Sequence, residues 1–160
     1  MSVVINGTGS ISGLSNVGGI SSAQSGSVLQ VVNATYSTEI STTSTSYATT
    51  NLTASITPNF STSKILVLIS APIGKNGSSG INLQLWRNAG SIFQLATNAG
   101  YDGTSNNCNG YSYAVGYLDS PATTSSTSYT LYYAATTSGQ QAKVFANSAL
   151  GTINLLEIAQ

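Results

Sequence analysis

Short runs in which apolar and polar residues alternate dominate the sequence from residue 28 onward. Alternation with a period of two places one face of a β-strand against a core and the other toward solvent. Thr, Val, Ile, Tyr and Phe are abundant, whereas the helix formers Glu, Lys and Arg are scarce, so the chain is predicted to be all β. The clearest runs are Leu52, Ala54 and Ile56; Ile81, Leu83 and Leu85; and Tyr111, Tyr113, Val115 and Tyr117.

Turn signals separate further predicted strands. Asn76-Gly77, Asn88 to Gly90 and Asp102-Gly103 supply residues that tolerate positive φ. About eight to ten short strands at this spacing predict an antiparallel sandwich, for which a jelly roll is the most economical arrangement. The additional strands are expected over residues 28–33, 44–49, 65–70, 92–97, 129–134, 142–147 and 152–158.

Two predicted strands are apolar at consecutive positions. Ile65 to Ile69 lacks alternation, and Leu155 is followed directly by Leu156. Successive side chains of a strand point to opposite faces, so both faces of these strands need cover. One face can meet the core and the other a neighbouring subunit, which predicts an oligomer with a subunit interface containing Leu66, Leu68, Leu155 and Leu156. The alternative is a monomer in which both strands lie centrally beneath long loops.

Residues 1–27 differ in composition from the remainder of the chain. A short apolar start is followed by repeated Gly and Ser residues, which is typical of an extended arm rather than a core. We expect residues 28–160 to form the β-sandwich domain and residues 1–27 to anchor it to an assembly partner, although an unordered tail is the alternative. The expected anchor residues are Val3, Val4, Ile5, Ile11 and Leu14.

The low charge of the chain excludes several classes of function. Only 5% of the 160 residues are charged, and four basic and four acidic residues cancel. Nucleic-acid binding normally requires clustered Lys and Arg, so no nucleic-acid partner is expected. The longest apolar run falls far short of the roughly 18 residues that span a bilayer, so no membrane partner is expected. No signal-peptide pattern is found at residue 1, which predicts synthesis in a cytosol.

The residues needed for common catalytic sites are absent or scattered. The chain has no histidine, which removes Ser-His-Asp and Cys-His nucleophilic systems and the commonest zinc ligand. Cys108 has no basic neighbour in sequence to activate it. The chain is therefore predicted to be non-enzymatic, with no metal and no cofactor. The four carboxylates, Glu39, Asp102, Asp119 and Glu157, lie in different predicted strands and loops.

Two of these carboxylates have structural interpretations. Asp119 precedes Pro121 by two residues and is predicted to be a turn residue that accepts backbone hydrogen bonds. Glu157 lies in the last apolar strand, where an unpaired buried carboxylate would be costly. We expect it to pair with one of the four basic residues.

Nine tyrosines point to a binding surface, because Tyr, Ser, Asn and Gly together make adaptable contacts at low entropic cost. Trp86, Tyr101, Tyr111 and Tyr113 are the candidate ligand-facing aromatics, with a host glycan as a possible ligand. The alternative is that these tyrosines cover the edge of a core.

Three segments resemble short virion structural proteins of tailed bacteriophages, especially those of cyanobacterial and aquatic hosts. They are residues 55–67 (SITPNFSTSKILV), 117–131 (YLDSPATTSSTSYTL) and 153–159 (INLLEIA), and the likeness extends over about residues 28–160. The opening residues 4–14 (VINGTGSISGL) look like the N-terminal arm of such proteins. The resemblance implies a trimeric jelly-roll domain, similar in outline to the tumour-necrosis-factor and C1q heads, on a capsid or fibre.

These observations lead to two main hypotheses for function. The first is a capsid decoration or cement protein at the virion surface, made in the host cytoplasm, that trimerises and docks on the major capsid protein through its arm. The second is the receptor-binding tip of a tail or head fibre that recognises host glycans. A lectin-like module and a lyase or hydrolase are weaker alternatives.

Overall fold

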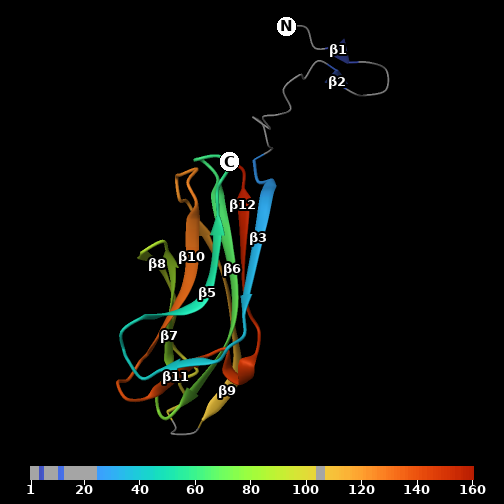
Figure 1. Ribbon diagram of the computed structural model, residues 1–160. Coiled ribbons are helices and arrows are strands. Elements are labelled where there is room, and N and C mark those ends of the chain that lie inside the picture. Colours follow the sequence, from blue (N-terminus) through green and yellow to red (C-terminus); the bar gives the residue numbers. More distant parts are fainter. Residues whose placement is uncertain (1–3, 6–10, 13–24, 104–106) are drawn as a thin grey trace.

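A computed structural model of the chain describes residues 4–5, 11–12, 25–103 and 107–160. From residue 25, two antiparallel β-sheets pack face to face, and the described residues include no α-helix (Figure 1). The elements are β1 (Val4–Ile5), β2 (Ile11–Ser12), β3 (Val28–Tyr36), β4 (Ile40–Thr42), β5 (Ala48–Ile56), β6 (Lys64–Asn76), β7 (Ile81–Arg87), β8 (Gly90–Ala99), β9 (Cys108–Asp119), β10 (Thr127–Ala135), β11 (Gln141–Val144), the 3-10 turn η1 (Ala146–Ser148) and β12 (Gly151–Ile158).

The strand order is that of a jelly roll. The first sheet places β3, β12, β6 and β9 side by side, and β11 with β4 continues it beyond the end of β12. The second sheet has the order β5, β10, β7, β8. Eight strands therefore form two four-stranded layers, which is the arrangement that two Greek keys produce. This arrangement confirms the predicted all-β, jelly-roll-like sandwich.

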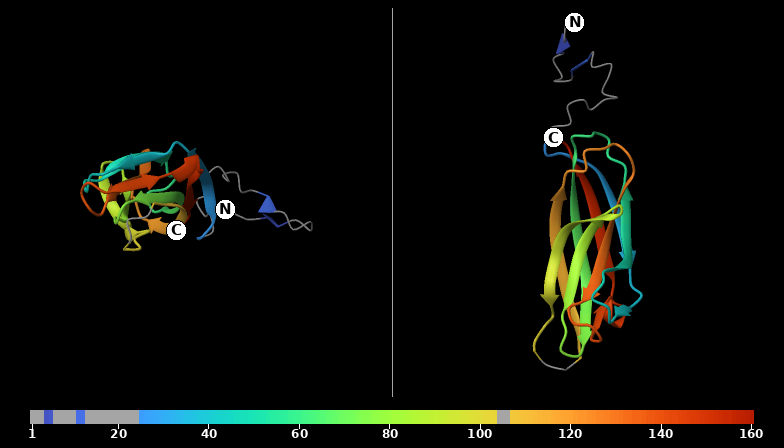
Figure 2. Two further views of the ribbon diagram at one scale, coloured as in Figure 1. Left: turned by 90° about the horizontal axis from the view of Figure 1, so that it is seen from below. Right: turned by 90° about the vertical axis from the view of Figure 1, so that its left-hand side faces the viewer.

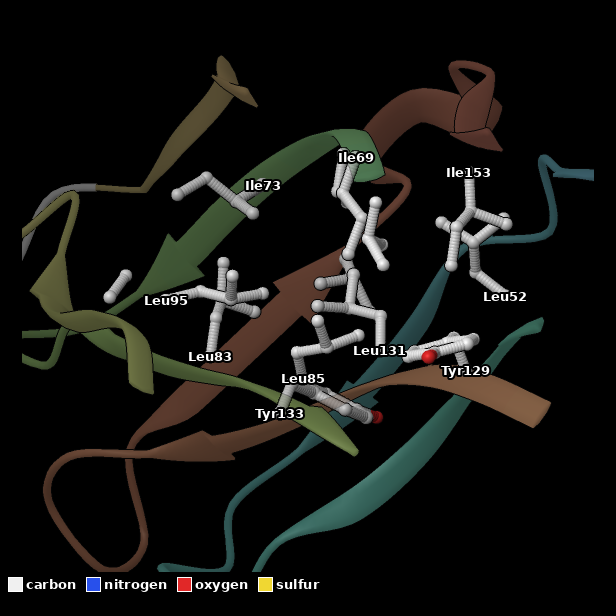
Figure 3. Packing of buried hydrophobic residues seen from close by; sticks show 14 of the residues in the cluster. Leu52, Ile69, Ile73, Leu83, Leu85, Leu95, Tyr129, Leu131, Tyr133 and Ile153 are labelled. Carbon is white, nitrogen blue, oxygen red and sulfur yellow. The ribbon is translucent and has the colours of Figure 1, made fainter. Parts of the chain in front are cut away.

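The core fills the space between the two sheets. The alternating residues of β5 and β7 point inward, as predicted, and belong to one buried cluster with Ile65, Val67 and Ile69 of β6. Figure 3 shows Leu52, Leu83, Leu85 and Ile69 of this cluster. Tyr113, Val115 and Tyr117 of β9 pack against this cluster and are partly buried. The period-two signal therefore identified the inward face correctly on each of these strands.

Two predicted strands have different limits in the structure. Residues 44–49 are mostly loop, because the hydroxyls of Thr42 and Ser44 accept hydrogen bonds from the backbone N–H groups of Ser44 and Ser46. Such local bonds compete with a sheet ladder. The strand expected over residues 142–147 ends at Val144, since Phe145 adopts a φ of 56° and turns the chain.

The predicted turns contain positive φ angles at the expected places. Gly77 has a φ of 87°, Asn88 of 53° and Gly103 of 71°. Glycine and asparagine adopt this left-handed region at the least steric cost. The first two turns therefore join β6 to β7 and β7 to β8 in the way that the sequence indicated, and Gly103 lies in the connection between β8 and β9.

Asp119 belongs to a buried network at the end of β9, so its prediction as a turn residue is wrong. Arg87 donates from Nη1 to both carboxylate oxygens, at 3.1 and 2.9 Å, and Tyr129 donates to Oδ2 at 2.7 Å. Burial, together with the hydrogen bond to Asp119, raises the pKa of Tyr129 well above its ordinary value. Tyr129 therefore remains a proton donor, and the network joins strands of both sheets.

The start of β3 and the end of β12 lie together at one end of the sandwich (Figures 1 and 2). Gly26 donates its backbone N–H to the Ala159 carbonyl at 2.9 Å, and Ala159 donates to the Ser27 carbonyl at 2.9 Å. We call these paired residues, 26–27 and 159, the arm root. Residues 1–24 therefore join the domain at the same end as the C-terminus.

Glu157 lies fully buried beside the arm root and has amide partners, so the predicted ion pair is wrong. Gln30 donates to Oε2 at 2.6 Å, and Asn59 donates its backbone N–H to Oε1 at 2.7 Å. Burial alone would raise the pKa of Glu157, but hydrogen bonds from Gln30, Asn59 and Phe60 outweigh it and hold the pKa below 4.5. The ionised carboxylate thus ties β12 to β3 and to the loop between β5 and β6.

Gly151 provides a test of packing at the start of β12. A Cβ atom there would collide with the Phe145 ring, whereas a Cβ atom at Gly90 would meet nothing closer than 4.0 Å. We expect Gly151→Ala to lower the free energy of unfolding by about 1–3 kcal/mol, because overpacking forces the ring to move. Urea unfolding would measure this loss, and Gly90→Ala, the control, should change stability by less than about 0.5 kcal/mol. Equal effects of the two substitutions would contradict the packing described here.

Glu157 provides a test of pH dependence. Because its folded pKa lies below the ordinary 4.5, its stabilisation is complete above that pH and is lost as the pH falls through the lowered pKa. Glu157→Gln should lower the free energy of unfolding by about 1–3 kcal/mol at pH 7. The reason is that the NH₂ group of the new amide would face the N–H donors that now bind the carboxylate. The difference in free energy of unfolding between the wild type and Glu157→Gln should shrink below pH 4.5. Denaturant titrations across pH 3–7 would measure it, with Glu39→Gln, which removes the carboxylate that pairs with Lys143, as the control.

Candidate assembly surface

The outer face of the first sheet carries a continuous apolar row. In the strand registers, Leu156 of β12 lies opposite Val31 of β3 and Leu66 of β6, and Leu66 lies opposite Leu118 of β9. We call these four residues the leucine row. Their chain neighbours point into the core, so the row faces outward, with Val31 60% and Leu118 49% exposed.

The residues predicted for a trimer interface divide between the two faces of this sheet. Leu66, Leu68 and Leu156 lie on the outer face, and Leu68 is 39% exposed. Leu155 is fully buried in the core, so it is unavailable to a partner. In the single chain the outward leucines are only partly covered, because Leu66 is partly buried and Leu68 is exposed. Their role at an interface stays a prediction.

A depression of about 400 Å³ lies next to the leucine row on the same face. Small side chains of β6 and β9 produce it, because Gly116 lies opposite Leu68 and Ala114 lies opposite Ser70. A Cβ atom at Gly116 would approach Leu68 Cδ2 to 3.1 Å, so the leucine already leans against the bare backbone. The lining residues are Leu68, Ile69, Ser70, Ala114, Val115, Gly116, Thr152 and Asn154.

The outer face is nearly free of charge. Along the outward positions of β3, β12, β6 and β9, the described residues include one charged side chain, Lys64, at the arm-root end. Beside the leucine row, the Asn33 amide donates a hydrogen bond to Asn154 Oδ1 at 2.8 Å. The described ion pairs lie elsewhere, between Lys75 and Asp102, Arg87 and Asp119, and Lys143 and Glu39. The part of this face away from Lys64 can therefore be covered without burying an unpaired charge.

The four predicted ligand-facing aromatics do not share one surface. Trp86 lies on the outer side of the second sheet and stacks on Tyr132, with ring centroids 4.2 Å apart. Tyr113 is partly buried and donates a hydrogen bond to the Leu95 carbonyl. Tyr101 and Tyr111 are about half exposed near the end away from the arm root. Of the four predicted residues, Tyr101 and Tyr111 are thus the two with the largest exposed fractions.

Two of the five predicted anchor residues lie outside the described residues. Val3 and Leu14 are not described, and Val4, Ile5 and Ile11 are known only through the pairing of β1 with β2, in which Ile5 lies opposite Ile11. The anchoring role of these residues stays a prediction.

No group of three His, Cys, Asp or Glu residues gathers within the described part of the chain in a way that could hold a metal ion. No helix in the same part of the chain is long and apolar enough to cross a membrane. Cys108 is the first residue of β9.

No protein-family model and no curated protein sequence matches the chain. Among solved structures, it is similar to the VP2 subviral particle of infectious bursal disease virus, with a TM-score of 0.46 and 10% identity over 82% of this chain and 38% of that one. It is also similar to the T13 particle of the same virus, with a TM-score of 0.43 and 12% identity over 84% of this chain and 37% of that one. The chain thus spans less than two-fifths of the length of these viral proteins.

Proposed function

We propose that this protein is a virion structural protein that works as a homotrimer on the surface of a tailed bacteriophage. Its role there is to decorate or cement the capsid, with residues 1–27 docking on the major capsid protein. The observation that carries the proposal is the leucine row beside an uncharged depression. Contiguous exposed apolar surface of this kind marks an interaction site in a soluble protein. Closed cyclic symmetry is the common way for copies of one chain to cover it.

The placement of the arm root supports a docking role for residues 1–27. The arm leaves the sandwich at one end, and the leucine row runs across its side. A docking segment and a self-association face can therefore act together without competing for the same surface. The resemblance of residues 28–160 to phage virion proteins supports the same setting.

The end opposite the arm root favours a second candidate, the receptor-binding tip of a fibre. Tyr101 and Tyr111 are exposed there, and Lys75 of β6 forms an ion pair with Asp102 in the Tyr101 loop. Exposed tyrosines can stack on the apolar face of a sugar. This surface would point away from a particle to which the arm is bound.

The first candidate is tested with particles of the virus that encodes the chain. Particles lacking the protein should still assemble but release their genome at a lower temperature, and added full-length protein should restore the wild-type value. Protein carrying Val4→Asp and Ile5→Asp should fail to restore it, because charge in an apolar anchor opposes docking. Thr8→Asp and Ser10→Asp, which add the same charge in the same arm, form the control and should restore it.

The outcome that would contradict decoration is unchanged particle stability without the protein. If adsorption to host cells were lost instead, and Tyr101→Ala with Tyr111→Ala reproduced that loss, the fibre-tip candidate would replace it.

A further inference from the structure

We propose that the outer face of the second sheet binds neutral carbohydrate at a site centred on the stacked rings of Trp86 and Tyr132. The two sheets pack face to face, so this surface lies on the other side of the sandwich from the leucine row (Figure 1). The site does not include Tyr101 or Tyr111, the residues of the fibre-tip candidate. The inference therefore goes beyond capsid decoration and does not depend on it.

The strand registers bring polar and aromatic side chains together on this face. Trp86 of β7 lies opposite Thr130 of β10. One position further along each strand face, Gln84 of β7 lies between Tyr132 of β10 and Gln94 of β8. The intervening residues of β7 and β10 are buried in the core, so these side chains point outward, and all of them are at least partly exposed. We call them the amide-aromatic face.

Hydrogen bonds hold the amides of this face in fixed orientations. Trp86 donates from Nε1 to Gln84 Oε1 at 3.0 Å, and Gln84 donates from Nε2 to Gln94 Oε1 at 2.8 Å. Gln94 in turn donates from Nε2 to the carbonyls of Leu83, at 3.0 Å, and Ala96, at 2.6 Å. Side chains that are already ordered lose little conformational entropy when a ligand binds, so the face is organised before it meets a partner.

The two rings are held in the same way. Their centroids are 4.2 Å apart and their planes differ by 16°, so each ring fixes the other. Aromatic side chains of this kind combine an apolar body with a polar tip, and they contact a ligand at low entropic cost. The C–H groups of a sugar ring can pack against the partly exposed pair.

A donor and an acceptor lie next to the rings. Gln84 Nε2 has two N–H groups and uses one of them on Gln94. Thr53 donates its hydroxyl proton to the Tyr129 carbonyl at 3.1 Å, so in its 2.7 Å contact with Thr130 it is the acceptor. The Thr130 hydroxyl therefore keeps lone pairs for a ligand. Sugar hydroxyls both donate and accept, which matches this pair of groups.

The absence of charge on this face favours a neutral sugar over other partners. Arg87 is the one charged residue in β5, β7, β8 and β10, and it is bound to Asp119. An acidic glycan or a nucleic acid would lose hydration there without meeting a cation. An apolar protein surface would leave the remaining amide and hydroxyl groups without partners. A neutral sugar satisfies both the rings and the polar groups.

The test uses the full-length protein and its own fluorescence, because Trp86 is the only tryptophan in the chain. The probes are neutral hexasaccharides built from glucose, galactose, mannose, rhamnose or N-acetylglucosamine, with hexagalacturonate as the acidic probe. We expect at least one neutral hexasaccharide to shift the tryptophan emission with a saturating titration curve. Hexagalacturonate should cause no saturating shift.

Substitutions locate the site. Tyr132→Ala should weaken the binding of that hexasaccharide roughly tenfold, because it removes one ring of the stacked pair. Tyr132→Phe keeps the ring and should stay within about threefold of the wild-type affinity. The control, Tyr101→Ala combined with Tyr111→Ala, removes two tyrosines elsewhere and should leave the affinity unchanged. Tyr132 points away from the core, so the fold should be kept, and circular dichroism checks each variant.

Four outcomes would overturn the inference. They are no binding of any neutral hexasaccharide, tighter binding of hexagalacturonate than of the neutral probes, binding without a change in tryptophan emission, and an affinity that Tyr132→Ala leaves unchanged. If the Tyr101 and Tyr111 substitutions abolished binding instead, the sugar site would be that of the fibre-tip candidate. Particle stability is measured separately, so capsid decoration can stand or fail independently of this site.

Discussion

Two central strands of the first sheet, β6 and β12, carry apolar side chains on both faces. The core between the sheets and the candidate assembly surface both depend on this constraint. In β6 and β12, the inward residues build the core, whereas the outward residues Leu66, Leu68 and Leu156 remain at least partly exposed. Burying apolar surface is worth about 25 cal/mol per Å², so a face of this kind gains stability from cover. Polar side chains at these outward positions would have been sufficient for a monomer.

The sandwich holds its few charges in places where they organise structure. Asp119 is bound by Arg87 and Tyr129 at the end of β9, and Glu157 is bound by Gln30 and Asn59 at the arm root. Hydroxyl and amide side chains supply the polar surface elsewhere. This distribution leaves the outer face of the first sheet free of opposing charges, which is the condition that an apolar contact between identical chains requires.

The fold could be predicted from sequence because period-two patterns and turn residues are local signals. Leu52, Ala54 and Ile56 define the face of their strand without reference to any other strand. The leucine row could not be predicted as a unit, since it depends on registers between strands that are distant in sequence. Leu155 and Leu156 show the limit clearly. Sequence requires that they point to opposite faces but does not say which residue meets the core.

Side-chain partners from different strands were also beyond sequence reasoning. The stacking of Trp86 on Tyr132 joins diagonal neighbours on β7 and β10, and the amide partners of Glu157 come from β3 and a loop. Such contacts follow from the register and twist of sheets. The abundance of tyrosine therefore predicted one binding surface, whereas the structure places its four residues in three regions. Trp86 lies on the second sheet, Tyr113 is partly buried, and Tyr101 and Tyr111 lie near the end away from the arm root.

The central claim is that the outer face of the first sheet is covered in the assembled protein. Carbene footprinting of the wild-type full-length chain, read by mass spectrometry, tests it directly. In a single chain, Leu118 is 49% and Leu150 is 58% exposed, so the two should label similarly if nothing covers either. The account predicts that Leu118 labels several-fold less than Leu150. Equal labelling of the two leucines would contradict it.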